Sequence, residues 1–221
     1  MNLVDRSWPD VLVGGTVILP LGSTEQHGPH LPLDTDTVIA SYIASRVQQS
    51  LGAGAVVAPA LPYGASGEHQ DFAGTVSIGT DALEHLLVEW ARSAFTWSSR
   101  LIIINGHGGN ADAVSRAERT MAAEGRDVVV CHCSVPGMDP HAGIAETSMM
   151  LAIDPDRVML DAAVPGNTAP LTELLPRMRA AGVRAVETSG VLGDPTGADP
   201  DLGHRFLDQM VRSIVEVVTP R

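Results

Sequence analysis

The sequence contains no lysine: all 14 of its basic residues are arginines, and 26 acidic residues give a formal net charge of −12. Without lysine, a catalytic Schiff base and the phosphate-binding lysine of a P-loop are both excluded. No basic cluster is present, although nucleic-acid binding needs grouped cations that displace the counterions of the phosphates. We therefore expect no nucleic-acid partner.

Cysteines are also scarce, since Cys131 and Cys133 are the only two in the chain. Two cysteines cannot build the disulfide framework of a small secreted protein, which agrees with a reducing compartment. Residues two apart share one face of a strand, so the pair could touch a metal, but buried neighbouring thiols are commoner in sheets. Packing is the favoured interpretation.

Long apolar runs are missing as well. No run approaches the roughly 18 residues that cross a bilayer, and residues 1–10 lack the basic start and hydrophobic stretch of a secretion signal. The 221 residues, 44% of them hydrophobic, can bury a full core. We expect one domain over residues 1–221, soluble and cytoplasmic, with no membrane partner.

Strand and helix patterns alternate along the chain, separated by short glycine and proline punctuation. Strands are predicted at residues 16–21, 55–61, 101–104 and 128–135, and helices at residues 35–51, 81–98, 110–124, 143–151, 171–181 and 201–218. This order is typical of an α/β fold with a mostly parallel sheet covered on both faces. The loops at residues 162–169 and 190–201 are candidates for contact with a ligand or a neighbouring subunit.

Two polar motifs follow predicted strands. Residues 23–32 (Ser-Thr-Glu-Gln-His-Gly-Pro-His-Leu-Pro) come after the first strand, and residues 105–110 (Asn-Gly-His-Gly-Gly-Asn) come after the third. Glu25 and His27 project the same way from an extended segment, and Asp36 begins a helix whose first-turn amides can hold its carboxylate. Since parallel strands end at the usual α/β active site, we expect His107 to join them.

Glu146 is the best candidate for a further carboxylate, because it lies in the first turns of a predicted helix, behind His141. Carboxylates mixed with imidazoles suit zinc, manganese or ferrous iron, and the absence of thiolate disfavours a structural zinc. A single histidine is more often a core residue, but so many grouped polar side chains are costly without a ligand. The set predicts a binuclear metal site.

The polar loop at residues 64–75 could lie over the metals with Glu68 or His69 facing substrate. For Glu68, a capping role in a surface connection is an equal alternative. Ser66 is the third candidate for substrate binding in this loop. Candidate anion partners for a substrate carboxylate are Arg157, Arg184 and Arg205, with no sequence feature that separates them.

Two rival chemistries have weaker support. Residues 106–111 fit the loose dinucleotide fingerprint G-x-G-x-x-A, but an imidazole fills the turn and the motif is not in the first βα unit. A serine nucleophile would need a G-x-S-x-G elbow, which the sequence lacks. A metal-activated water is the better nucleophile.

The motifs at residues 19–32, 35–36 and 105–110, together with His141-Ala142-Gly143, Glu146-Thr147-Ser148 and residues 190–195, resemble the creatininase family. The similarity runs from about residue 8 to residue 218. It implies a metal-dependent amidohydrolase with a three-layer α/β/α fold, assembled as a homo-oligomer. The implied ligands are Glu25, His27, Asp36, His107 and Glu146, with Asp36 bridging two divalent ions.

The resemblance also implies that His141 lies near the reacting amide, where it would pass a proton to the departing amine, with a nearby carboxylate as competitor. Asp36 and Glu146 complete the expected catalytic set. Creatininase itself has a glutamate two residues after the motif histidine, where this chain has Gly109. The second metal would therefore depend on Glu146.

Within the family, residues 66–72, the compact length and the lack of tryptophan after Trp97 are most similar to the mycofactocin branch. That branch is a peptidase that removes Val-Tyr from the C-terminus of the modified mycofactocin precursor peptide. The implied cofactors are two ions of zinc, ferrous iron or manganese, and the implied assembly is a hexamer or octamer. The alternative is a family hydrolase acting on a small cyclic amide or a formamide.

Overall fold

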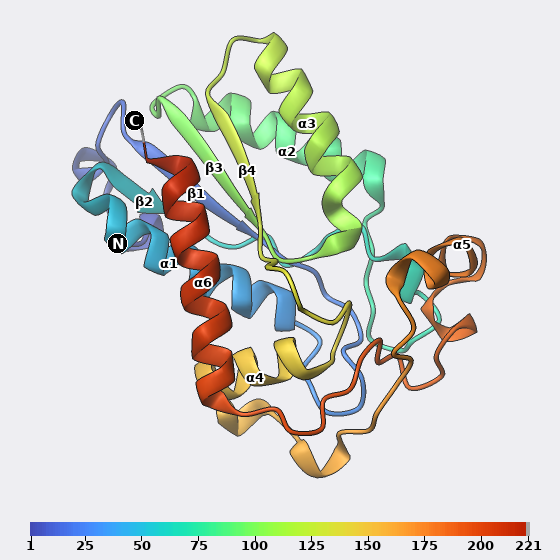
Figure 1. Ribbon diagram of the computed structural model, residues 1–221. Helices are drawn as coiled ribbons and strands as arrows, with labels where there is room; N and C mark the ends of the chain where they lie inside the picture. The colour runs from blue at the N-terminus through green and yellow to red at the C-terminus, as the bar shows by residue number, and fades with distance from the viewer. Residues whose placement is uncertain (220–221) are drawn as a thin grey trace.

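The computed structural model describes residues 1–219 and has a parallel sheet at its centre, with strand order β2-β1-β3-β4 (Figure 1). The strands are β1 (Thr16–Leu21), β2 (Ala55–Val57), β3 (Arg100–Asn105) and β4 (Val128–His132). In the register of the sheet, Leu21 is opposite Asn105, and Asn105 is opposite His132. Three strands therefore end at one level, which forms a common edge for the segments that follow them.

Helices cover both faces of the sheet (Figure 1). On one face lie α1 (Thr35–Leu51), α4 (Ile144–Ile153) and α6 (Pro200–Val218), and on the other lie α2 (Thr80–Ala94) and α3 (Ala111–Ala123). Because alternate strand residues point to opposite faces, Ile18 packs in the first core and Val17 in the second. The expected α/β fold with three layers is confirmed; α5 (Leu171–Ala181) lies at the periphery.

Most predicted elements form close to their expected bounds, and the main corrections concern element ends. The second strand stops at Val57 rather than residue 61. Beyond it the ladder loses its regular spacing: the Ala58 amide donates to the Ile18 carbonyl, but the next bond to β1 comes from the Leu61 amide, to the Pro20 carbonyl. The helix predicted to reach residue 98 ends at Ala94, where the Ser98 hydroxyl donates to the Ala94 carbonyl at 2.9 Å. The strand predicted to reach residue 135 ends at His132.

Cys131 and Cys133 are free and buried in the core beneath α1, α4 and α6, as the packing interpretation predicts. Burial raises the pKa of Cys131 to about 11, which keeps its thiol protonated and unreactive. Within residues 1–219, none of the helices has both the length and the apolar character needed to span a membrane.

Candidate metal centre

The polar cluster forms where β1 and β3 meet the start of α1. Two glycines make this close approach possible: a Cβ at Gly22 would lie 2.4 Å from the Cα of Thr37, and one at Gly106 would lie 2.5 Å from the Asp36 carbonyl oxygen. The strand ends therefore press directly against the first turn of α1. Glu25 and His27 follow β1, and His107 follows β3.

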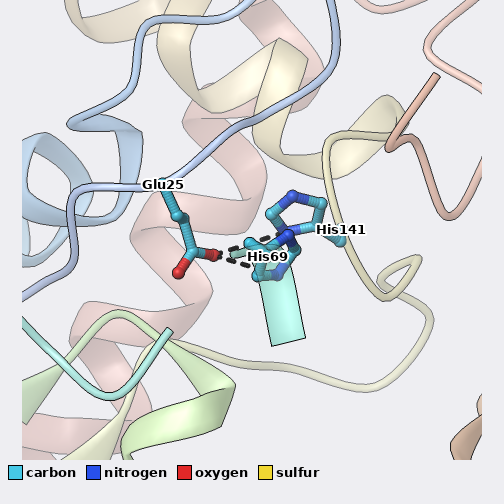
Figure 2. Close-up of side chains that lie close together, drawn as sticks. All are labelled: Glu25, His69 and His141. Atoms are coloured by element: carbon cyan, nitrogen blue, oxygen red, sulfur yellow. Dashed lines mark ion pairs between the residues drawn. The ribbon is translucent and has the colours of Figure 1, made fainter. Parts of the chain in front are cut away.

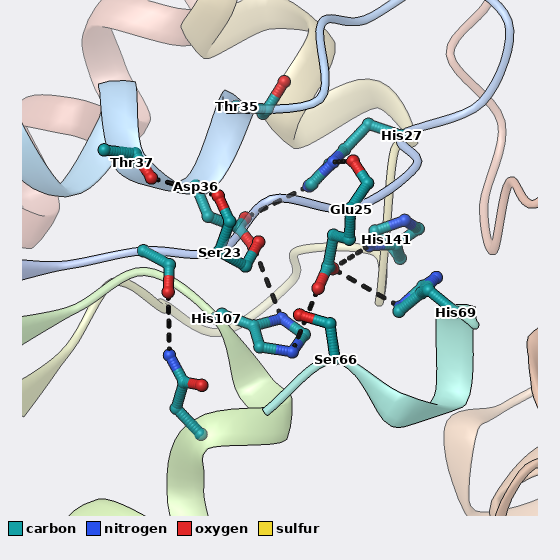
Figure 3. A network of polar contacts seen from close by, with 12 residues as sticks. Ser23, Glu25, His27, Thr35, Asp36, Thr37, Ser66, His69, His107 and His141 are labelled. Atoms are coloured by element: carbon teal, nitrogen blue, oxygen red, sulfur yellow. Dashed lines mark hydrogen bonds and ion pairs between the residues drawn. The ribbon is translucent and has the colours of Figure 1, made fainter. Parts of the chain in front are cut away.

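Four predicted ligands lie within contact of one another in this region (Figure 3). Nε2 of His107 is 3.1 Å from Oε2 of Glu25, and Nδ1 of His107 is 3.3 Å from Oδ2 of Asp36. Nε2 of His27 is 3.1 Å from Oδ1 of Asp36. Asp36 therefore lies between the two imidazoles.

Asp36 is held differently from the sequence expectation. Its carboxylate accepts a hydrogen bond from the Ser23 hydroxyl at 2.7 Å and contacts His27 and His107, rather than the first-turn amides of α1. The physical reason is that Ser23, His27 and His107 offer the buried carboxylate its hydrogen-bond and charge partners at the strand ends. Asp36 is 2% exposed, so it acts within the cluster and not as a surface cap.

Glu146 reaches the cluster from the N-terminal end of α4. Its Oε2 lies 3.9 Å from Nε2 of His27 and accepts a hydrogen bond from the Ala142 amide at 2.6 Å. Asp139 fixes this helix end, because its carboxylate accepts hydrogen bonds from the amides of Ile144 and Ala145. Sequence reasoning missed Asp139, although an acidic residue shortly before a predicted helix is a recognisable capping signal.

His69 and His141 lie closer to Glu25 than the sequence suggested (Figure 2). Oε1 of Glu25 is 3.4 Å from Nε2 of His69 and 3.9 Å from Nδ1 of His141. Three groups within the described residues bring ligand atoms within 4.8 Å of one another: Glu25, His69 and His141; His27, His141 and Glu146; and Glu25, His27 and Asp36. The structure therefore adds two histidines to the possible metal donors.

The other predicted substrate residues border the same cluster. Oε1 of Glu68 lies 3.5 Å from Nε2 of His107, so Glu68 reaches inward from its loop. It has room because position 109 is a glycine: a Cβ there would lie 2.4 Å from the same oxygen. Ser66 is fully buried, and its hydroxyl has no hydrogen-bond partner among residues 1–219.

The pKa values of the cluster are shifted because several carboxylates and imidazoles are buried close together. Burial alone would lower the pKa of His27, but the charge and hydrogen bond of Asp36, with Glu146 and Glu25, raise it to about 10. Burial would likewise lower the pKa of His107, but Glu25 and Asp36 raise it well above its usual value. Burial raises the pKa of Glu146 to about 7, against the opposing charge of His27. The buried carboxylates therefore strongly favour positive charge next to them, either as protons on the histidines or as bound cations.

Glu25 tests whether the cluster fits metal ions. Its side chain is fully buried, and neither carboxylate oxygen has a hydrogen-bond partner among the described residues. Burying a carboxylate costs several kcal/mol in real proteins unless positive charge or hydrogen bonds offset the loss of water. A divalent cation would supply that compensation, and oxygens combined with imidazole nitrogens suit zinc, manganese or ferrous iron. The residues present fit such ions.

The three candidate anion partners lie in different settings. Arg157 pairs with Asp34. Arg184 donates to the Asp71 carbonyl at 3.0 Å and lies 5.4 Å from the centre of the Phe72 ring. Arg205 is exposed on α6. Arg184 is thus the one tied to the loop that carries Glu68 and His69.

Comparisons with known proteins agree with the fold. The creatininase family model, described as creatinine amidohydrolase, matches residues 5–218. The chain is 56% identical over 204 residues to "Mycofactocin precursor peptide peptidase" of Mycolicibacterium smegmatis, covering 90% of this chain and 83% of that protein. The protein of the same name from Mycobacterium tuberculosis is 53% identical over 211 residues, covering 92% and 84%.

A solved structure described as creatininase with Mn superposes with a TM-score of 0.77 at 26% identity, covering 98% of this chain and 96% of that one. The family match spans nearly the whole chain, and the sequence similarity and the fold point the same way. This chain belongs to the creatininase family.

Proposed function

We propose that the protein is a metal-dependent peptidase that hydrolyses an amide bond near the C-terminus of the modified mycofactocin precursor peptide and releases Val-Tyr. The observation that carries the proposal is the 56% identity to the mycofactocin precursor peptide peptidase, against 26% to the creatininase structure. Identity at that level across 90% of the chain supports a shared substrate class.

The proposed centre holds two divalent ions of zinc, ferrous iron or manganese. Glu25 and His107 would hold one ion, His27 and Glu146 the other, and Asp36 would bridge them. The spacing supports this pairing, because Asp36 lies within 3.3 Å of both imidazoles. When bound, such a pair makes a shared water more acidic and polarises the carbonyl to be cleaved.

The roles of the remaining residues are assigned from their positions relative to the cluster. His141 turns Nδ1 toward Glu25, and this nitrogen would carry a proton to the departing amine. A nearby carboxylate is the competitor for the same task. Ser66, Glu68 and His69 border the cluster on the loop side, where they would contact the peptide.

The decisive experiment is turnover of the metal-loaded protein on the modified precursor peptide, followed by mass spectrometry. We expect free Val-Tyr and a peptide shortened by two residues, with no release after metal is removed by chelation. Absence of the dipeptide under conditions where both metal sites are filled would contradict the proposal.

A second function has support from the family model, which is described as creatinine amidohydrolase. In this alternative the protein hydrolyses a small cyclic amide or a formamide. Creatinine and a formamide belong in parallel reactions of the same experiment. Ring-opened product or formate without peptide cleavage would favour the alternative.

We also propose that residues 1–221 form one cytoplasmic domain that assembles as a hexamer or octamer. The family match to residues 5–218 supports a single unit, and the last two residues of the range lie outside the described residues. Light scattering on the purified protein would give the size of the assembly.

A further inference from the structure

The side chain of Gln26 lies between two histidines of the cluster. Its Nε2 is 2.8 Å from Nδ1 of His69, 3.0 Å from Nε2 of His141 and 3.0 Å from the carbonyl oxygen of Gly190. Gln26 is 5% exposed, so these contacts are shielded from water. The sequence predicted roles for the residues on both sides of Gln26 and none for Gln26 itself.

The orientation of the Gln26 amide is fixed by the backbone. The Gly28 amide donates to Oε1 of Gln26 at 2.8 Å, and a backbone N–H can only donate. The other end of the amide must therefore be the NH₂ group. It has two hydrogens to give and three neighbours that could accept them.

The backbone carbonyl of Gln26 reduces the three neighbours to two. It lies 2.8 Å from Nε2 of His141, and an oxygen at that distance requires a hydrogen on the nitrogen. Nε2 of His141 is then a donor and cannot accept from the Gln26 side chain. The two NH₂ hydrogens are left for Nδ1 of His69 and the Gly190 carbonyl, so every donor and acceptor is matched.

We propose that Gln26 is a positioning residue that holds His69 and His141 in the same Nε2–H tautomer while they face the cluster through different nitrogens. His69 faces Glu25 through Nε2 and so presents an N–H donor. His141 faces Glu25 through Nδ1 and so presents a lone pair. In the neutral ring, His69 is thereby removed from the metal donors, whereas His141 is free to accept a hydrogen or bind a cation (Figure 2).

The glycine-rich loop after residue 189 serves this arrangement. Gly190 has φ +83°, and a Cβ there would lie 2.0 Å from Oε1 of Gln26, so a side chain would displace the amide. Two residues later, Leu192 exchanges backbone hydrogen bonds with His141, at 3.2 and 2.9 Å. One loop thus supplies the acceptor for Gln26 and fixes the backbone of His141.

The tautomers can be read directly by NMR on the zinc-loaded protein with ¹⁵N-labelled histidine. Long-range ¹H–¹⁵N correlation distinguishes a protonated ring nitrogen from an unprotonated one. We expect hydrogen on Nε2 and none on Nδ1 for both His69 and His141. A hydrogen on Nδ1 of His69 in the unaltered protein would overturn the proposal, whether or not any variant folds.

Substitution separates the side chain from the backbone of Gln26. Gln26→Met removes the side-chain NH₂ donor but keeps the backbone carbonyl of residue 26. We therefore expect the ¹H–¹⁵N spectrum of His69 to show a mixture of the two tautomers, while that of His141 is unchanged. Gln70→Met, an exposed glutamine next to His69, is the matched control and should leave both signatures alone. Unchanged tautomers in Gln26→Met, with the fold intact by circular dichroism, would contradict the proposal.

The catalytic consequence rests on the proposed function. We expect Gln26→Met to lower kcat on the precursor peptide by roughly 10- to 100-fold with little change in KM, as for other partners that orient site residues. The NMR result does not depend on the substrate. If the peptide is not cleaved but the tautomers are as expected, the proposed function fails and the role of Gln26 stands.

Discussion

Asp36 joins two histidines of the cluster. Its two oxygens reach His27 and His107, and Ser23 donates to one of them. Burial would raise its pKa, but the positive charges of His27 and His107 hold that pKa well below the usual value. The residue therefore keeps its negative charge to lower pH than an ordinary aspartate does.

Replacing this carboxylate should disable the centre. Asp36→Asn keeps the shape but removes the charge, so we expect metal content to fall below two ions per chain and kcat/KM to fall at least about 100-fold, the upper end for partners that only orient ligands. Elemental analysis and peptide turnover measure the two effects. Asp156→Asn, which alters an exposed carboxylate outside the cluster, is the control. Two ions and normal turnover in Asp36→Asn would refute the bridging role.

The sequence predicted the residues of the cluster that lie in motifs but not all of their partners. Glu25, His27 and His107 follow strands whose ends must meet, so their proximity could be inferred from topology. The approach of His69 to Glu25 depends on how a loop more than 40 residues away folds back, which local spacing does not encode. Gln26 was missed because a neutral amide is neither a usual metal ligand nor an acid or base, so nothing in the sequence marks it as part of the site.

Packing between helices decides whether Glu146 reaches the cluster. α4 carries Glu146, and α6 packs against α4 through Gly203, where a Cβ would lie 2.0 Å from the Ser148 carbonyl oxygen. The two backbones are therefore in direct contact. The start of α6 is tied to α4 as well, because the Asp199 amide donates to the Ser148 hydroxyl at 3.2 Å.

A methyl group at this contact should force the helices apart. We expect Gly203→Ala to destabilise the protein by about 1–3 kcal/mol, the usual cost of overpacking, which lowers Tm by roughly 2 to 12 °C for a chain of this size. Thermal unfolding measures the change. Gly54→Ala is the matched control, since a Cβ at Gly54 meets no atom within 4 Å and its φ is not positive. Equal Tm values for the two variants would show that the contact is not tight.

The end of α1 was easier to predict than the end of β2. The range predicted for α1 is confirmed residue for residue, because its apolar stripe stops at Gly52, which ends the helix with φ 73°. β2 is only three residues long, and its end is set by its pairing with β1 rather than by its apolar run. Strand length depends on the partner strand, and the apolar pattern of one segment does not show where that partner ends.

At the scale of the whole molecule, the layered fold gathers carboxylates and imidazoles from five separate segments at one edge of the sheet. The alternation of strands and helices was enough to predict this edge. It did not predict the charge balance, which depends on burial. In the absence of bound cations, protons on His27 and His107 supply the positive charge next to the carboxylates, as the raised pKa values of these histidines indicate.

Because His27 and His107 bind protons tightly, we expect stability to depend on pH and, if the proposed metal centre forms, on metal. The folded pKa of His27 is about 10, above its usual 6.5, so its stabilising contribution is complete below pH 6.5 and is lost as pH rises toward 10. A cation can bind Nε2 of His27 only when this nitrogen carries no proton, so cations bind better as pH rises. We therefore expect the chelated protein to lose stability between about pH 7 and about pH 9, while the zinc-loaded protein loses less.

Thermal unfolding with zinc and with chelator at both pH values checks this expectation. Ligand at 100 times its Kd adds about 2.7 kcal/mol per site, which corresponds to roughly 5 to 11 °C in Tm. The gap between loaded and chelated protein should widen at the higher pH, and Asp36→Asn should narrow it at both. A gap that is constant with pH would mean that no proton leaves His27 when metal binds, and the imidazole would then lie outside the metal centre.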